Sequence, residues 1–385
     1  MMTRNPPTHF RLMASRYVQM MQAARGRQCT GTVTIGFTGH DYVQGAITDD
    51  PGISWLVATL SALTGLSVAN TFDSVVLTVI VSAILIGFAG FRRLYPDRRA
   101  RLLGAAMFVC VAFAQAKLAD VYIFQSAPLV AGIPWVIHFG YRRHSLALNL
   151  TAAALAFVCS WCALVRIGTD LVCLAFLITL FVCRRRLQNV FLPVILIIFS
   201  CLPALIFTHF MVARRNAILV GLGKAAPAVN RHTVWHSVYI GLAFIPNSEV
   251  PAYDDSVAAN KVRSIDPSIS TASASDEAIL RDEVFKLARR RPMLVIENLA
   301  AKFAVLAALA AILLFPSRRY LFADRNVFWL DAAFVAAMAM SATSAVLVIP
   351  HSSYLLTYVC LTCLYSCVKF CAGHFVPEAE KVSFA

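Results

Sequence analysis

Charged residues are scarce in this 385-residue chain, at 14% of the total. Soluble globular proteins carry about a quarter charged residues, whereas here 59% of the residues are hydrophobic. The scarcity excludes an ordinary cytosolic enzyme, a disordered chain and a nucleic-acid-binding protein. The composition instead predicts an all-α, polytopic transmembrane helical bundle whose environment is a lipid bilayer.

Motifs of soluble catalysis are also missing. The sequence has no P-loop, no glycine-rich dinucleotide box and no G-x-S-x-G motif. Acidic residues within the apolar runs are nearly absent, and Asp331, the main one, lies near the end of its run. Ion-coupled transporters need charges at mid-depth, so the sequence favours chemistry at one face of the membrane.

Apolar runs separated by short polar loops predict about nine spans. Several of them are close to the lower limit of about 17 residues for a helix that crosses a bilayer. The expected spans are 74–91, 102–117, 122–140, 146–165, 168–183, 189–212, 298–316, 327–349 and 353–371.

Every second short loop is rich in arginine, as in Arg92–Arg93, Arg142–Arg143 and Arg184–Arg186. The positive-inside rule assigns such loops to the cytoplasm. The outer loop 39–73 and the long outer loop 213–297 then face outward, and the tail 372–385 lies inside. Residues 1–38 form a poorly defined N-terminal segment, and 39–371 form the bundle with its outer loops.

Segment 53–70 supports two interpretations. It is nearly long enough for a tenth span, which would move the N-terminus to the cytoplasm, but its five Ser and Thr side chains suit an interfacial helix. Within the long loop, residues 275–291 predict an amphipathic helix near the membrane surface. Ser275 is the expected N-cap, and Leu280, Val284 and Leu287 form its apolar stripe.

Two adjacent acids, Asp49 and Asp50, precede Pro51-Gly52. They could simply form a turn and cap the helix that follows. Alternatively, one carboxylate could act as a general base or bind a metal ion.

Basic residues and histidines of the outer loops could likewise have either a structural role or a role in binding a ligand. His232 and His236 are four residues apart and could share a helix face that binds a metal, although the pattern H-E-x-x-H is absent. Arg214 and Arg215 could anchor a helix end or bind a lipid phosphate, and the same alternatives apply to Arg166 and His351.

This layout resembles the GT-C superfamily of integral membrane glycosyltransferases. An outer loop with paired acids and a surface helix precedes a bundle with Arg-rich inner loops, a large outer loop containing residues 231–267, and a last outer loop Pro350-His351-Ser352-Ser353-Tyr354. The resemblance implies transfer of a sugar from a polyprenyl-phosphate donor to an acceptor on the extracytoplasmic face of a bacterial inner membrane. It also implies that segment 53–70 is the surface helix and that the acids lie outside.

In such enzymes an acid of the first outer loop is the base or a metal ligand, and basic residues or histidines hold the donor phosphate. By this resemblance Asp49 and Asp50 are the catalytic candidates, and a divalent cation, Mg²⁺ or Mn²⁺, is an expected cofactor of unknown ligands. The substrate-binding candidates are Asp41, Arg214, Arg215, His232, His236, Tyr239, His351 and Tyr354.

Members of the superfamily begin with a span that delivers the first loop outward, and no such span precedes residue 39 here. A truncated, non-catalytic relative is therefore one alternative. A transporter or flippase of a lipid-linked molecule is another, and it would need a polar path through the bundle.

Overall fold

The structure is a computed structural model that describes residues 33–35, 42–44, 51–142, 145–184, 191–221, 234–269, 273–322 and 327–375. Helices dominate it, which confirms the predicted all-α class. Two short strands, β1 (Val33–Ile35) and β2 (Tyr42–Gln44), pair antiparallel with Thr34 opposite Val43. This small hairpin was not expected from the sequence.

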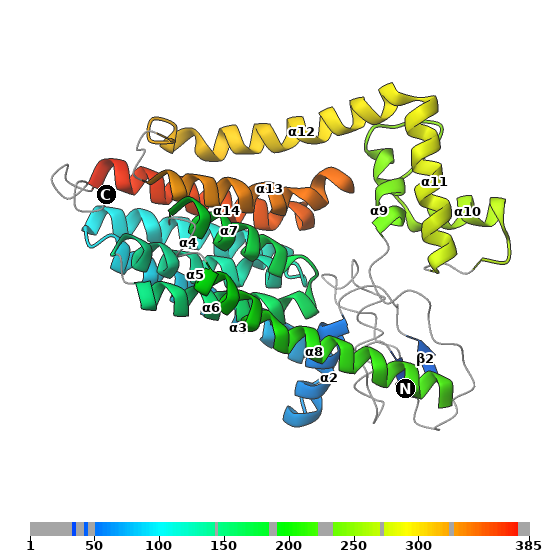
Figure 1. Ribbon diagram of the computed structural model, residues 1–385, viewed down its shortest axis with the longest axis horizontal. Coiled ribbons are helices and arrows are strands. Elements are labelled where there is room, and N and C mark those ends of the chain that lie inside the picture. The colour runs from blue at the N-terminus through cyan, green and yellow to red at the C-terminus, as the bar shows by residue number, and fades with distance from the viewer. Residues whose placement is uncertain are drawn as a thin grey trace.

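Eight of the described helices have the length and composition of membrane spans. They lie side by side as a bundle (Figure 1). They are α3 (Val68–Leu94), α4 (Arg98–Leu118), α5 (Ile123–Tyr141), α6 (Ser145–Val165), α8 (Phe191–Gly221), α12 (Pro292–Leu314), α13 (Phe328–Leu347) and α14 (Ser352–Phe375).

The predicted span 168–183 is the exception. It forms α7 (Thr169–Arg184), whose 16 residues make a helix of about 24 Å, shorter than a hydrocarbon core of about 30 Å. The side chains of Phe176, Leu177 and Leu180 are buried on one face of α7. α7 packs closely on α13. Eight of the nine expected spans therefore have the length of a membrane span in the described part of the chain, and α7, which exposes Leu171, Ile178 and Val182, is shorter.

Segment 53–70 is not a tenth span. α2 (Pro51–Thr64) has only 14 residues, and the chain leaves it through Gly65, whose φ of +72° is a left-handed conformation that suits glycine. Ser67 then caps α3 by accepting a hydrogen bond from the backbone N–H of Asn70 at 3.2 Å. α2 packs on α3 and α6 at one end of the bundle.

The two ends of the bundle differ in charge. The ends of α3, α5 and α7, which carry described arginines of the Arg-rich loops, lie at the end of the bundle where α14 finishes (Figure 1). There the guanidinium of Arg184 donates to the carbonyl of Gly140 and lies 5.7 Å from the ring of Trp329. We call this the inner end, because the positive-inside rule assigns it to the cytoplasm, and the opposite end the outer end.

At the outer end, the long loop folds into a helical subdomain. It comprises α9 (Val234–Gly241), the 3-10 turn η3 (Leu242–Phe244), α10 (Asp255–Ile265) and α11 (Ala274–Arg290). Asn298 of α12 donates to the carbonyl of Leu242 at 2.7 Å, and Gly241 lies directly against the carbonyl of Val348. These contacts join the subdomain to α12 and to the end of α13.

The predicted helix 275–291 corresponds closely to α11, with two corrections. The N-cap is Ser273, not Ser275, and its hydroxyl accepts from the N–H of Asp276 at 3.1 Å. The stripe of Leu280, Val284 and Leu287 packs on α9 and α10 within the subdomain core. Its apolar face is therefore covered by protein and is not available to lie on the membrane surface.

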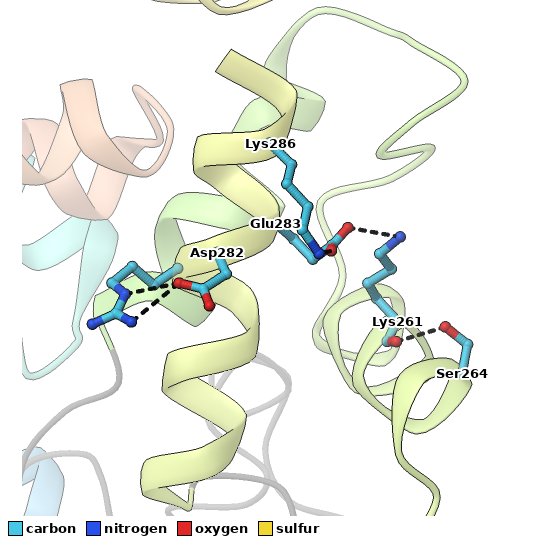
Figure 2. Close-up of polar contacts among 6 residues, drawn as sticks. Lys261, Ser264, Asp282, Glu283 and Lys286 are labelled. Carbon is cyan, nitrogen blue, oxygen red and sulfur yellow. Dashed lines mark hydrogen bonds and ion pairs between the residues drawn. The ribbon is translucent and has the colours of Figure 1, made fainter. Parts of the chain in front are cut away.

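Ion pairs hold α10 against α11 (Figure 2). Glu283 on α11 contacts Lys261 of α10 at 2.9 Å and Lys286 of its own helix at 2.7 Å. Partial burial favours the neutral acid, but the two ammonium groups outweigh it and lower the pKa of Glu283. The carboxylate thus stays charged and links the two helices.

Candidate functional site

Six of the ten predicted site residues lie outside the parts of the chain whose side chains are described. Asp41, Asp49, Asp50 and His232 fall outside the described residues. Arg214 and Arg215 belong to α8, which continues beyond them to Gly221, but their side chains are not described. His236, Tyr239, His351 and Tyr354 can be placed.

A buried arginine at the outer end is the centre of the most distinctive polar cluster. Arg166 lies in the turn between α6 and α7, which is closed by Gly168 at a φ of +92°. The Arg166 side chain is only 8% exposed, and its guanidinium carbon lies 4.0 Å from the ring centroid of Tyr122. This is a cation–π contact, strengthened by removal of the pair from water.

Two more tyrosines complete what we call the Arg166 cluster: Tyr122, Arg166, Tyr253 and Tyr354. The rings of Tyr122 and Tyr354 meet edge-on at 5.4 Å between centroids. The hydroxyl oxygens of Tyr354 and Tyr253 lie 3.4 Å apart. The cluster therefore joins the start of α5, the α6–α7 turn, the start of α14 and the loop before α10.

Tyr253 stays a neutral phenol in this setting. Burial raises its pKa most, the neighbouring Tyr354 and Asp255 raise it further, and Arg166 works in the opposite direction. The cluster thus presents a fixed cation beside hydroxyl groups that both donate and accept hydrogen bonds. That combination suits a phosphate or another oxyanion.

Amide and hydroxyl groups about one helical turn from the cluster form hydrogen bonds between neighbouring helices. Thr357 donates to Oε1 of Gln125 at 3.2 Å, one turn of α14 from Tyr354. Gln115 of α4 donates to the hydroxyl of Ser126 at 2.8 Å. These bonds link α4, α5 and α14 about one turn from the helix ends that carry Tyr122 and Tyr354.

His236 forms a second polar group in the subdomain. Its Nε2 lies 3.1 Å from Oδ1 of Asp255, two residues beyond Tyr253. Burial favours the neutral ring, but the hydrogen bond and charge of Asp255, together with Asp276 and Glu277, outweigh it and raise the pKa of His236. Glu277 also accepts from the N–H of His236 and so caps α9.

Neither of the other two candidates contacts the Arg166 cluster through a hydrogen bond that the described residues show. Tyr239 is buried in the subdomain core, where burial and two nearby carboxylates raise its pKa to about 12. His351 is exposed, and its Nδ1 accepts from the N–H of Ser353 at 3.4 Å. In the structure this histidine caps α14.

Within the described residues, no group of three or more His, Cys, Asp or Glu side chains is placed to hold a metal ion. Asp49, Asp50 and His232, from which such a site was expected, lie outside that part. The divalent cation therefore stays a prediction.

From the sequence, Arg166 is a candidate helix anchor or phosphate ligand, and Tyr122 is expected on the same face as loop 350–354. Tyr122, Tyr253 and Asp255 are not among the predicted site residues. The available signal was weak: one arginine in a short outer turn between two apolar helices. Nothing local in the sequence links it to tyrosines 44, 87 and 188 positions away.

These features define a polytopic α-helical membrane protein with eight candidate spans and a helical subdomain at one end. Comparison of the chain with protein-family models, curated proteins and solved structures finds no match to any of them.

Proposed function

We propose that this protein transfers a sugar from a polyprenyl-phosphate donor to an acceptor at the outer end of the bundle. The observation that carries the proposal is the buried Arg166, held against Tyr122 beside the hydroxyls of Tyr253 and Tyr354. A protein of this kind would lie in a bacterial inner membrane, with the outer end outside the cytoplasm.

The leaving group in such a transfer is a lipid phosphate, which gains charge as the bond to the sugar breaks. A preorganised cation and hydroxyl donors in a site shielded from water stabilise that charge. Arg166 is a buried cation, and Tyr354 and the partly exposed Tyr253 supply hydroxyl groups beside it. Their place at one end of the spans also suits a donor whose lipid tail stays in the bilayer.

The predicted acids are connected to the same region through α2. Asp50 is bonded to Pro51, the first residue of α2. Gly52 packs so closely on the carbonyl of Leu164 that a Cβ atom would collide with it. Leu164 is two residues before Arg166, so chain connectivity favours a site that contains both the carboxylates and the guanidinium.

The reaction follows from these roles. The acceptor oxygen attacks the anomeric carbon of the sugar, and Asp49 or Asp50 takes the acceptor's proton. The bond between the anomeric carbon and the phosphate oxygen breaks, and Arg166 stabilises the polyprenyl phosphate that leaves. A divalent cation bound by the acids would supply further charge stabilisation.

A transfer assay in membranes tests the proposal, with a panel of radiolabelled polyprenyl-phosphate hexoses as donors. We expect Asp49→Asn or Asp50→Asn to lower the rate by about 100- to 10,000-fold, because one of them removes the base. Asp282→Asn is the matched control, since Asp282 is an exposed acid of α11 that contacts Arg281 (Figure 2). Full transfer by both Asn variants would reject the assignment.

A transporter or flippase of a lipid-linked molecule is the second candidate. It is favoured by the polar side chains on α14, the helix at the centre of the bundle: Thr357, Thr362, Ser366 and Lys369. They extend from the outer to the inner half of the helix, although protein groups bond several of them. Movement of a fluorescent polyprenyl phosphate between the leaflets of reconstituted vesicles, with no sugar transfer, would favour this candidate.

A further inference from the structure

α12 carries a lysine on its protein-facing side. Asn298, Lys302 and Leu306 are spaced four residues apart and form the buried stripe of this helix. Phe303 and Ile312, on other faces of α12, are exposed, as lipid-facing residues should be. Lys302 therefore points into the protein and is 1% exposed.

The residues one turn before and one turn after Lys302 on this stripe form hydrogen bonds to other elements. One turn toward the outer end, Asn298 donates to the carbonyl of Leu242 in η3. One turn toward the inner end, the carbonyl of Leu306 accepts from the hydroxyl of Tyr358 on α14 at 3.2 Å. Lys302 thus lies where α12, α14 and the helical subdomain converge.

Two polar groups remain unsatisfied there. In the described part of the chain, no hydrogen bond or ion pair reaches the Lys302 ammonium, and Oδ1 of Asn298 is buried with no donor. The amide orientation of Asn298 is fixed, because its Nδ2 must face the Leu242 carbonyl. Since a buried charge is very unfavourable without a partner, this site lacks an anion and a hydroxyl donor.

The depth of Lys302 indicates where that anion comes from. Glu297 is exposed on the same helix and marks the polar region, and Lys302 is five residues further on, about 7.5 Å along the axis. A lysine side chain at that depth reaches the level of lipid phosphates. The exposed Arg289 and Arg290 at the end of α11 attract anionic headgroups to the same region.

We propose that Lys302 and Asn298 form a binding site for a phosphate group that carries a neighbouring hydroxyl, as in the headgroup of an anionic phospholipid. Lys302 pairs with the phosphate, and Oδ1 of Asn298 accepts from the hydroxyl. The site lies on α12, which carries no residue of the Arg166 cluster. It does not depend on sugar transfer.

Thermal unfolding of the purified full chain in detergent tests this site. Dioctanoyl phosphatidylglycerol should raise the unfolding temperature saturably, and Lys302→Met should weaken its apparent affinity at least tenfold. Lys302→Arg should keep it within about threefold, because the charge is retained. Dioctanoyl phosphatidylcholine is the zwitterionic lipid control, and Lys286→Met, at an exposed lysine of α11, is the matched variant.

Inorganic phosphate alone forms the second arm. A Lys302-dependent shift with phosphatidylglycerol but not with inorganic phosphate assigns the site to a lipid headgroup. A shift with inorganic phosphate assigns it to free phosphate. No Lys302-dependent shift in either arm overturns the proposal.

Asn298→Asp gives an independent check if Lys302→Met does not fold. The new carboxylate lies one turn from Lys302 and can replace the anion. This variant gives up the hydrogen bond to the carbonyl of Leu242, so its readout is the lipid response: phosphatidylglycerol should no longer raise its unfolding temperature. A wild-type response in Asn298→Asp would also contradict the site.

Discussion

Replacing Arg166 with Gln should lower the rate of sugar transfer by about 100- to 1,000-fold, the usual cost of removing one preorganised group that stabilises developing charge. The loss should fall mainly on kcat, because the phosphate charge grows as the bond to the sugar breaks. Arg166→Lys should recover only part of it. Lysine keeps the charge but loses the planar guanidinium that lies against Tyr122.

The control for this variant is Arg142→Gln, an exposed arginine at the inner end. It should transfer at the wild-type rate and unfold at the wild-type temperature. If Arg166→Gln is folded by the same measurement and transfers sugar normally, Arg166 has no part in the reaction and the Arg166 cluster is structural.

Breaking the ion pair between Asp331 and Lys369 should be the most damaging change to stability in the bundle. Asp331 is fully buried, and Lys369 is 4% exposed. The ammonium lies 2.9 Å from Oδ1 of Asp331, which also accepts from the hydroxyl of Tyr365 at 2.8 Å. Lys369→Met leaves the carboxylate without its partner charge, at a cost of about 3–5 kcal/mol.

Thermal unfolding monitored by the loss of monodisperse protein in detergent measures this cost. The double variant Asp331→Leu with Lys369→Met should recover most of the lost stability, because it removes both charges together. A single Lys369→Met variant as stable as the wild-type chain would show that the pair does not hold α13 to α14.

The helices were predictable from the sequence because their signals are local. Apolar runs, arginine pairs at helix ends and the acidic first turn of α11 all act within a few residues. The residues 275–291 and the observed Ala274–Arg290 agree to one residue at each end. The N-cap was misplaced by two residues, since several serines precede the helix and each could cap it.

The lengths of the helices and the elements that they pack against were harder to predict, because both depend on tertiary packing. Apolar composition alone does not distinguish α7, which has only 16 residues, from a full span. The stripe of α11 is equally compatible with lipid and with protein, and the fold decides in favour of α9 and α10.

The candidate site was predicted only in part for the same reason. Tyr354 and His236 were selected as polar residues near outer loops, and each has a polar partner at the outer end. The partners come from distant segments: Tyr354 meets Tyr253 across 101 positions. Asp331 was expected near a span end, and the structure adds that Lys369 neutralises it.

Sugar transfer at the outer end requires the paired acids and the helical subdomain to lie on one side of the membrane. Single cysteines in a chain freed of its 11 native cysteines test this directly, by labelling intact cells with a membrane-impermeant maleimide. We predict labelling from outside at positions 49 and 275, with Arg319→Cys labelled only after permeabilisation. Labelling at position 275 from outside and at position 49 only from inside would contradict the account.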